Sequence, residues 1–183
     1  MKVAASLRLR LFGSFEARRP SGQTVEITGK KGQALLAYLA LHPGKSLPRE
    51  KLVNLLWSDR EDAQARGNLR QALVALRRDL EGIDPAPLLF ERDTIAADAA
   101  ALSTDVTEFE WLASSDALDD LRQAAKLYEG NFLEGLAIRD PAFEEWLSGE
   151  QGRLREIAVA VLERLAALST GAEALIIAKR LLA

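Results

Sequence analysis

The chain has 183 residues and a formal net charge of −3, with 48% hydrophobic and 28% charged residues. This composition excludes the disordered and fibrous classes, and the length suffices for one ordinary domain or two small ones with a hydrophobic core. The absence of Cys excludes disulfide scaffolds, iron–sulfur clusters and thiol nucleophiles, and a single His argues against metal cages and Ser-His-Asp catalysis. We therefore predict no catalytic residue, no metal and no cofactor. No apolar run approaches the roughly 20 residues that span a bilayer, so we expect a cytoplasmic protein without a membrane partner.

Charge is unevenly divided along the chain. Residues 1–104 carry 16 Lys and Arg against 12 Asp and Glu, a net charge of +4, whereas residues 105–183 carry 8 against 15, a net charge of −7. A basic unit joined to an acidic one is the pattern expected when the first contacts a polyanion and the second contacts protein.

The first 27 residues predict a small antiparallel sheet. Leu7, Leu9 and Leu11 alternate with polar residues, which is the period of a strand with one buried face. Residues 15–18 and 23–27 are predicted as two further short strands, separated by a Pro-Ser-Gly turn.

Three helices are predicted next, over residues 30–41, 48–57 and 63–80, because apolar residues recur there at helical spacing and stop signals follow. The single His, His42, follows the first helix, and we expect it to cap the last carbonyls of that helix. Residues 88–97 then predict a β-hairpin around a polar turn.

The third helix has two distinct sides. Leu69, Leu73, Leu76 and Leu80 fall on one face at about 100° per residue and form the predicted core side. The outward positions, rich in guanidinium groups that can bind phosphates and base edges, are Arg66, Arg70, Gln71, Val74, Arg77 and Arg78. Such a face is also common on ordinary amphipathic helices, and taken alone it favours a solvated surface.

The order of the elements favours a DNA-binding face over an ordinary solvated surface. A sheet, three helices and a hairpin form a winged helix-turn-helix, here over residues 1–103, whose third helix enters the DNA major groove. Lys30 and Lys31, at the start of the first helix, lack the glycine spacing of a phosphate loop, and we expect them near a DNA phosphate or simply solvating the helix start. Arg92 is the one basic residue of the hairpin and is the predicted contact of the wing.

From residue 104 onward the pattern is helical, with helices expected over residues 106–113, 117–128, 141–168 and 173–182. Paired helices without strands predict an all-α domain, either a helix bundle or a helical repeat of the tetratricopeptide-like (TPR-like) kind, and we expect it to be truncated at its C-terminal end. Trp111 and Trp146, which have Leu neighbours, are predicted to pack inside it.

Segments in both halves carry a family resemblance. In the first half they are residues 9–13 (LRLFG), 30–40 (KKGQALLAYLA), 48–57 (PREKLVNLLW) and 68–80 (NLRQALVALRRDL). In the second half they are residues 105–109 (DVTEF), 128–136 (YEGNFLEGL), and 146–147 (WL) with 153–155 (RLR). In this order they resemble the SARP/AfsR-type transcriptional activators. In that family an OmpR/PhoB-type winged helix precedes a bacterial transcriptional activation domain (BTAD).

The resemblance implies a DNA-binding transcriptional activator. Its fold would be mainly α, with a small antiparallel sheet, a hairpin wing and a TPR-like helical domain over residues 104–183. Its partners would be double-stranded promoter DNA, RNA polymerase subunits and a second copy of the chain in a homodimer on DNA. In such proteins the third helix lies in the major groove and the loop at residues 58–62 faces the polymerase.

Two departures from the family pattern keep an alternative open. Ala75 stands where relatives carry Arg or another polar residue, and residues 94–97 of the wing (TIAA) offer no cation. The alternative is the N-terminal protein-interaction module of a larger signalling protein, with weakened or lost DNA binding. An enzyme ranks third, because no acid, base, nucleophile or metal constellation assembles.

Overall fold

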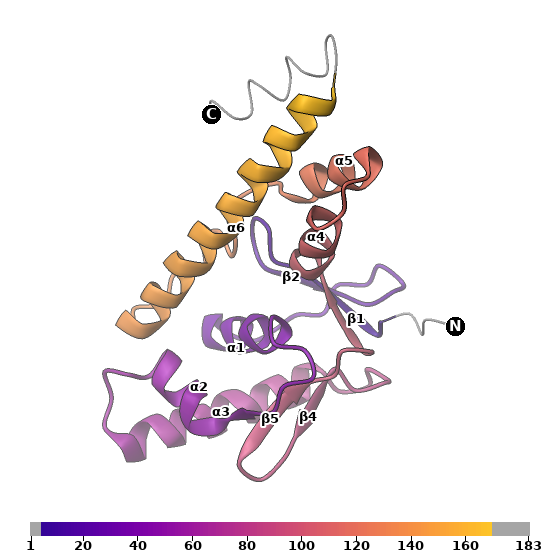
Figure 1. Cartoon of the computed structure of the whole chain (residues 1–183). Coiled ribbons are helices and arrows are strands. Elements are labelled where there is room, and N and C mark those ends of the chain that lie inside the picture. The colour runs from indigo at the N-terminus through magenta and orange to yellow at the C-terminus, as the bar shows by residue number, and fades with distance from the viewer. Residues whose placement is uncertain (1–4, 170–183) are drawn as a thin grey trace.

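The N-terminal sheet is built around β1 (Leu7–Arg10) in the computed structural model, which describes residues 5–169 (Figure 1). β2 (Glu16–Arg18) pairs with β1 in antiparallel orientation, and β6 (Leu102–Thr104) pairs with its other edge in parallel orientation. Leu7 and Leu9 are fully buried while the intervening arginines are exposed, as the alternation predicts.

Residues 23–27 do not form the predicted strand. They make an isolated bridge between Arg18 and Thr24, and the Val25 N–H donates a 2.8 Å hydrogen bond to the Ala17 carbonyl, but no regular strand forms. Val25 and Ile27 are nevertheless buried, so the alternation reflects an extended segment lying on the core. The unpredicted β6 has only three residues, too few for a periodic pattern to reveal.

The helix-turn-helix and the wing follow the sequence closely. The elements are α1 (Lys30–Ala40), α2 (Arg49–Leu56), α3 (Asp62–Asp79), and a second sheet of β3 (Leu47–Pro48), β5 (Thr94–Ala97) and β4 (Leu88–Phe90). The predicted hairpin is therefore confirmed, with β3 added to its β5 edge. Nδ1 of His42 lies 2.8 Å from the Tyr38 carbonyl oxygen, which confirms the capping role.

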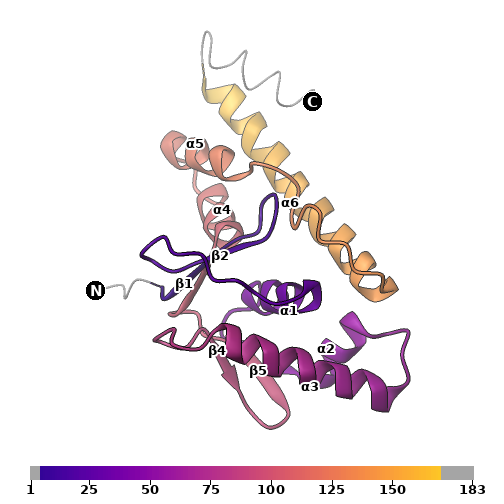
Figure 2. The same ribbon diagram turned by 180° about the vertical axis from the view of Figure 1, so that it is seen from behind.

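The second half is helical, as predicted, with α4 (Asp105–Ala113), α5 (Leu118–Leu127) and the long α6 (Pro141–Leu168) (Figures 1 and 2). The helix predicted at residues 173–182 lies outside the described residues. Trp146 is half-buried and packs edge-on against Tyr38 at a ring distance of 5.1 Å. The packing predicted for Trp111 is wrong. Its side chain is 69% exposed, because Phe109 and Leu112 define the buried face of α4.

The two halves share one hydrophobic core, with Phe12 at their junction. Its ring packs edge-on against Phe109 at 5.2 Å and Tyr128 at 5.1 Å. The backbone beside it is also engaged, because the Leu133 N–H donates to the Leu11 carbonyl at 2.7 Å. These contacts fix the helical half against the first strand of the winged helix.

A buried carboxylate makes a second junction. Asp140 caps the N-terminus of α6 by accepting a 3.1 Å hydrogen bond from the Ala142 N–H, and it is only 1% exposed. It also accepts hydrogen bonds of 2.8 Å from both the N–H and the hydroxyl of Ser58, which follows α2. One side chain thereby ties the loop between α2 and α3 to the start of α6.

We expect Asp140→Ala to lower the free energy of unfolding by about 1–3 kcal/mol, because it removes a helix cap together with the buried acceptor of the two Ser58 hydrogen bonds. Urea unfolding followed by circular dichroism measures the change. Glu156→Ala, at an exposed position of the same helix, should stay within about 0.5 kcal/mol of the unmutated chain. Equal stability of the two variants would contradict the role assigned to Asp140.

Asp105 gives a pH-dependent prediction. Burial raises the pKa of its carboxyl. Hydrogen bonds from the Phe12, Leu11 and Val106 N–H groups lower the pKa, but by less than burial raises it. The folded chain therefore binds this proton more tightly than the unfolded chain does. The group's contribution to stability is fully present below the unfolded pKa of about 3.9 and declines as pH rises through the folded value. We compare the unfolding free energy of the unmutated chain with that of Asp105→Asn. The value for the unmutated chain minus the value for the variant should fall as pH rises from the unfolded pKa through the folded pKa of Asp105. A rise in that difference would refute the assignment.

Candidate nucleic-acid interface

α3 lies at the surface of the winged helix (Figure 2), and its outer side carries exposed, mostly polar residues. Leu69, Leu73, Leu76 and Leu80 are all buried beneath it, which confirms the predicted core side. The helix packs through this seam on α1 and α2. Its opposite side is consequently free to meet a partner.

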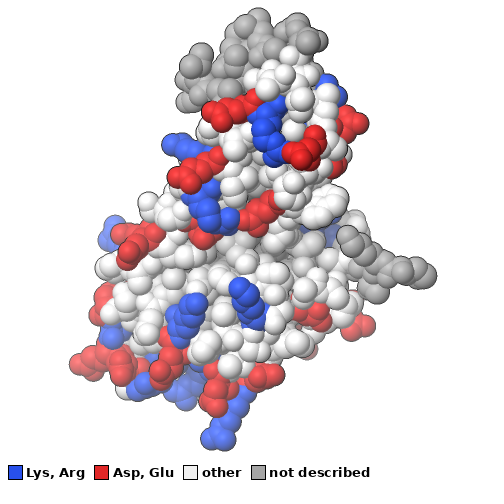
Figure 3. Space-filling view, viewed as in Figure 1, with Lys and Arg blue, Asp and Glu red and all other residues white. Residues whose placement is uncertain are grey.

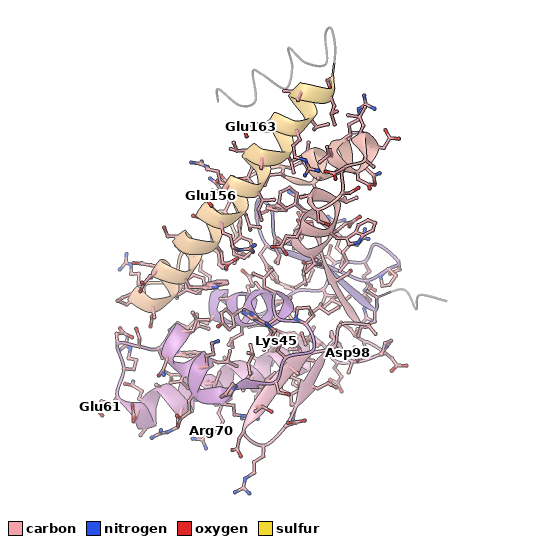
Figure 4. All side chains as sticks on the ribbon, in the orientation of Figure 1. Lys45, Glu61, Arg70, Asp98, Glu156 and Glu163 are labelled. Atoms are coloured by element: carbon pink, nitrogen blue, oxygen red, sulfur yellow. The ribbon has the colours of Figure 1, made fainter. Side chains whose placement is uncertain are left out.

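All six outward positions predicted on α3 are exposed: Arg66, Arg70, Gln71, Val74, Arg77 and Arg78. Figure 4 shows Arg70 pointing away from the rest of the molecule. Arg70 makes no ion pair with any other residue in the described range 5–169. Its guanidinium is therefore available for a bidentate contact without losing an existing partner.

Two other arginines of α3 already have acidic neighbours. Arg66 lies 3.9 Å from both Glu50 and Asp62, and Arg78 lies 3.6 Å from Asp79. Figure 3 shows that blue and red side chains are also interleaved on the opposite face of this end of the molecule, over α2 and the hairpin. The Arg66 pairs are exposed on both sides and contribute at most about 1 kcal/mol, so a phosphate can replace the carboxylate there, whereas the Asp79 side chain beside Arg78 is buried.

The hairpin is attached to this surface by two more arginines. The guanidinium of Arg77 lies over the Phe90 ring at 4.5 Å, a cation–π contact between α3 and β4. Arg49, at the start of α2, donates from its guanidinium to the Glu91 carbonyl and from its backbone N–H to the Asp93 carbonyl, both at 2.9 Å. These contacts hold the turn that carries the exposed Arg92. Sequence reasoning missed Arg49, because its partners are backbone carbonyls that no residue pattern reveals.

The structure separates the two lysines that the sequence placed together. Lys30 is exposed at the start of α1. Lys31 turns inward, where its ammonium donates to the Leu56 carbonyl and lies 4.4 Å from the centre of the Trp57 ring. Burial lowers the pKa of Lys31, and the nearby Asp140 carboxylate opposes that shift. Lys31 is thus corrected from a phosphate contact to an internal link between α1 and α2.

Lys31→Ala should lower the free energy of unfolding by about 1–3 kcal/mol, since the Leu56 carbonyl loses its charged donor. Lys30→Ala removes the same charge from an exposed position and should change it by less than about 0.5 kcal/mol. Thermal and urea unfolding of both variants test the assignment, and equal losses in the two would contradict it.

Neither a metal centre nor a membrane span emerges from residues 5–169. No group of three or more His, Cys, Asp or Glu in that range could hold a metal ion. The helices in the same range are too short or too polar to cross a bilayer.

Comparison with known proteins agrees with this geometry. Residues 22–93, which run from the end of the first sheet to the hairpin turn, match the family described as transcriptional regulatory protein, C terminal. No curated protein matched the chain. The fold is similar to Mycobacterium tuberculosis EmbR, solved in complex with a low-affinity phosphopeptide, with a TM-score of 0.68 and 18% identity. The match covers 89% of this chain and 48% of the EmbR chain, so this chain spans about half of that protein.

The matched segment contains α1, α2, α3 and, of the wing, β4 with the turn, and the similarity to EmbR extends over the helical half as well. The segment similar to the transcriptional regulatory proteins is thus the helix-turn-helix part of this chain, and the fold of the chain is similar to that of EmbR.

Proposed function

We propose that the chain is a DNA-binding transcriptional activator that places α3 in the major groove of promoter DNA and the β4–β5 hairpin along a neighbouring groove. The observation that carries the proposal is the outer side of α3, whose cationic and amide groups are all exposed above a buried leucine seam. The family match over residues 22–93 supports it independently.

The contacts divide by chemistry. Arg70 and Gln71 are the proposed readers of base edges, because guanidinium and amide groups form paired hydrogen bonds with guanine and adenine. The other cations of the surface would bind phosphates, which position the helix without reading sequence: Arg66, Arg77, Arg78, Lys30 and Arg92.

For the activation of transcription, the proposal assigns protein contacts to the helical half. Residues 1–103 form the DNA-binding unit and residues 104–183 the interaction unit in this scheme, although β6 crosses the boundary by pairing with β1. The loop at residues 58–62 is exposed throughout and would contact RNA polymerase. Its first residue, Ser58, is held by Asp140, so the loop has a defined orientation relative to α6. Residues 104–183 would also mediate homodimerisation on DNA in the cytoplasm.

The alternative, an interaction module that has lost DNA binding, is favoured by one observation. The acidic neighbours of Arg66 and Arg78 reduce the positive potential of the surface, and the wing offers only Arg92. Measurement of DNA affinity separates the two functions.

Fluorescence anisotropy with duplexes selected from a randomised pool tests the proposal. The unmutated chain should bind with an affinity that falls steeply between about 50 and 200 mM salt. Arg70→Ala combined with Arg77→Ala should weaken binding roughly tenfold or more, and loss of the Arg77 contact should lower the salt slope by about 1.

Arg155→Ala is the matched control, because it removes an exposed arginine from α6 and leaves α3 unchanged. It should bind like the unmutated chain. Indifference of binding to the double substitution would overturn the assignment of α3. If a folded chain binds no duplex at all, the interaction module replaces the activator.

A further inference from the structure

Val74 is an apolar side chain in the middle of the polar outer side of α3. It is 71% exposed and lies one helical turn from Arg70 on one side and from Arg78 on the other. A β-branched residue at an exposed helix position lowers helix propensity relative to alanine, and with 71% of its surface exposed this valine buries little apolar area. Folding therefore gives no reason for valine at this position.

The surface around this valine is a strip of α3 that is widely open to solvent and lined by residues of α3 alone. Apart from the flanking Arg70, Gln71 and Arg78, its lining consists of Val74, Ala75 and Gly67. An added Cβ at Gly67 would meet no other atom within 4 Å, so glycine is not required there by packing inside the protein. The surface is thus small and apolar at its centre and cationic at its edges.

A DNA major groove offers one apolar group that matches such a surface. Thymine presents its C5-methyl there, whereas the other base edges present hydrogen-bond donors and acceptors. A rise of about 1.5 Å per residue places Val74 about 6 Å along α3 from Arg70, a distance close to two base-pair steps. A thymine methyl can therefore lie on Val74 while Arg70 contacts a nearby base.

We propose that Val74 recognises the C5-methyl of a thymine in the bound site, with Gly67 and Ala75 leaving room for close approach of the base. This inference rests on the proposed function, and it names a base that the site contains. Ala75, which departs from the family pattern, then contributes to selectivity by its small size.

The test uses the duplex bound most tightly from a randomised pool and replaces each thymine in turn by deoxyuridine, which removes only the methyl group. Replacement at one position should weaken binding of the unmutated chain about fourfold, the value of one buried methyl group. In Val74→Ala the same replacement should have no effect. Val159→Ala, an exposed valine on α6, should retain the fourfold discrimination.

The outcomes separate this inference from the proposed function. Salt-dependent binding that is insensitive to every thymine replacement overturns the role of Val74 and leaves the activator proposal intact. Discrimination that persists in Val74→Ala also overturns it, because another group then contacts the methyl. Self-association in the absence of DNA that Val74→Ala abolishes would assign the residue to a contact between copies. Failure of the folded chain to bind any duplex overturns both.

Discussion

Burial of the leucine seam of α3 against α1 and α2 is the constraint on which the proposed interface depends. Four leucines at helical spacing leave only one way to dock the helix, and that orientation sends Arg70, Gln71 and Val74 into solvent. Each buried leucine contributes about 1.5–3 kcal/mol, far more than the exposed ion pairs of the opposite side. Hydrophobic packing therefore determines where the charges lie, and the ion pairs adjust to it.

The same packing logic joins the winged helix to the helical half. Phe12 belongs to the N-terminal segment, yet its ring lies among rings from α4 and the end of α5. Asp140 then connects the start of α6 to the loop after α2 through Ser58. Two junctions, one apolar and one polar, restrain rotation of one half against the other. A contact made by α3 is thus linked through packed elements to the surface presented by α6.

Sequence periodicity predicted the helices and the wing because their signals are local. The seam of α3 and the turn at Arg92 each follow from neighbouring residues. The parallel pairing of β6 with β1 depends on segments about 95 residues apart, which a local pattern cannot reveal. The predictions of a phosphate contact for Lys31 and of internal packing for Trp111 were wrong for a related reason. Residue type indicates what a side chain can do, whereas the surrounding fold determines whether it turns inward or outward.

Charge distribution decides how such a surface could discriminate between DNA sequences. Arg66 and Arg78 already interact with carboxylates, so contact with a phosphate exchanges one anionic partner for another and gains less than an unpaired cation would. Arg70 has no such partner among the described residues, so a contact with DNA adds an interaction without replacing one. Weak phosphate binding lowers affinity for every sequence alike, whereas base contacts raise it for one. A surface on which Arg66 and Arg78 are screened by carboxylates, while Arg70 and Val74 are exposed for base contacts, therefore favours selectivity over non-specific affinity.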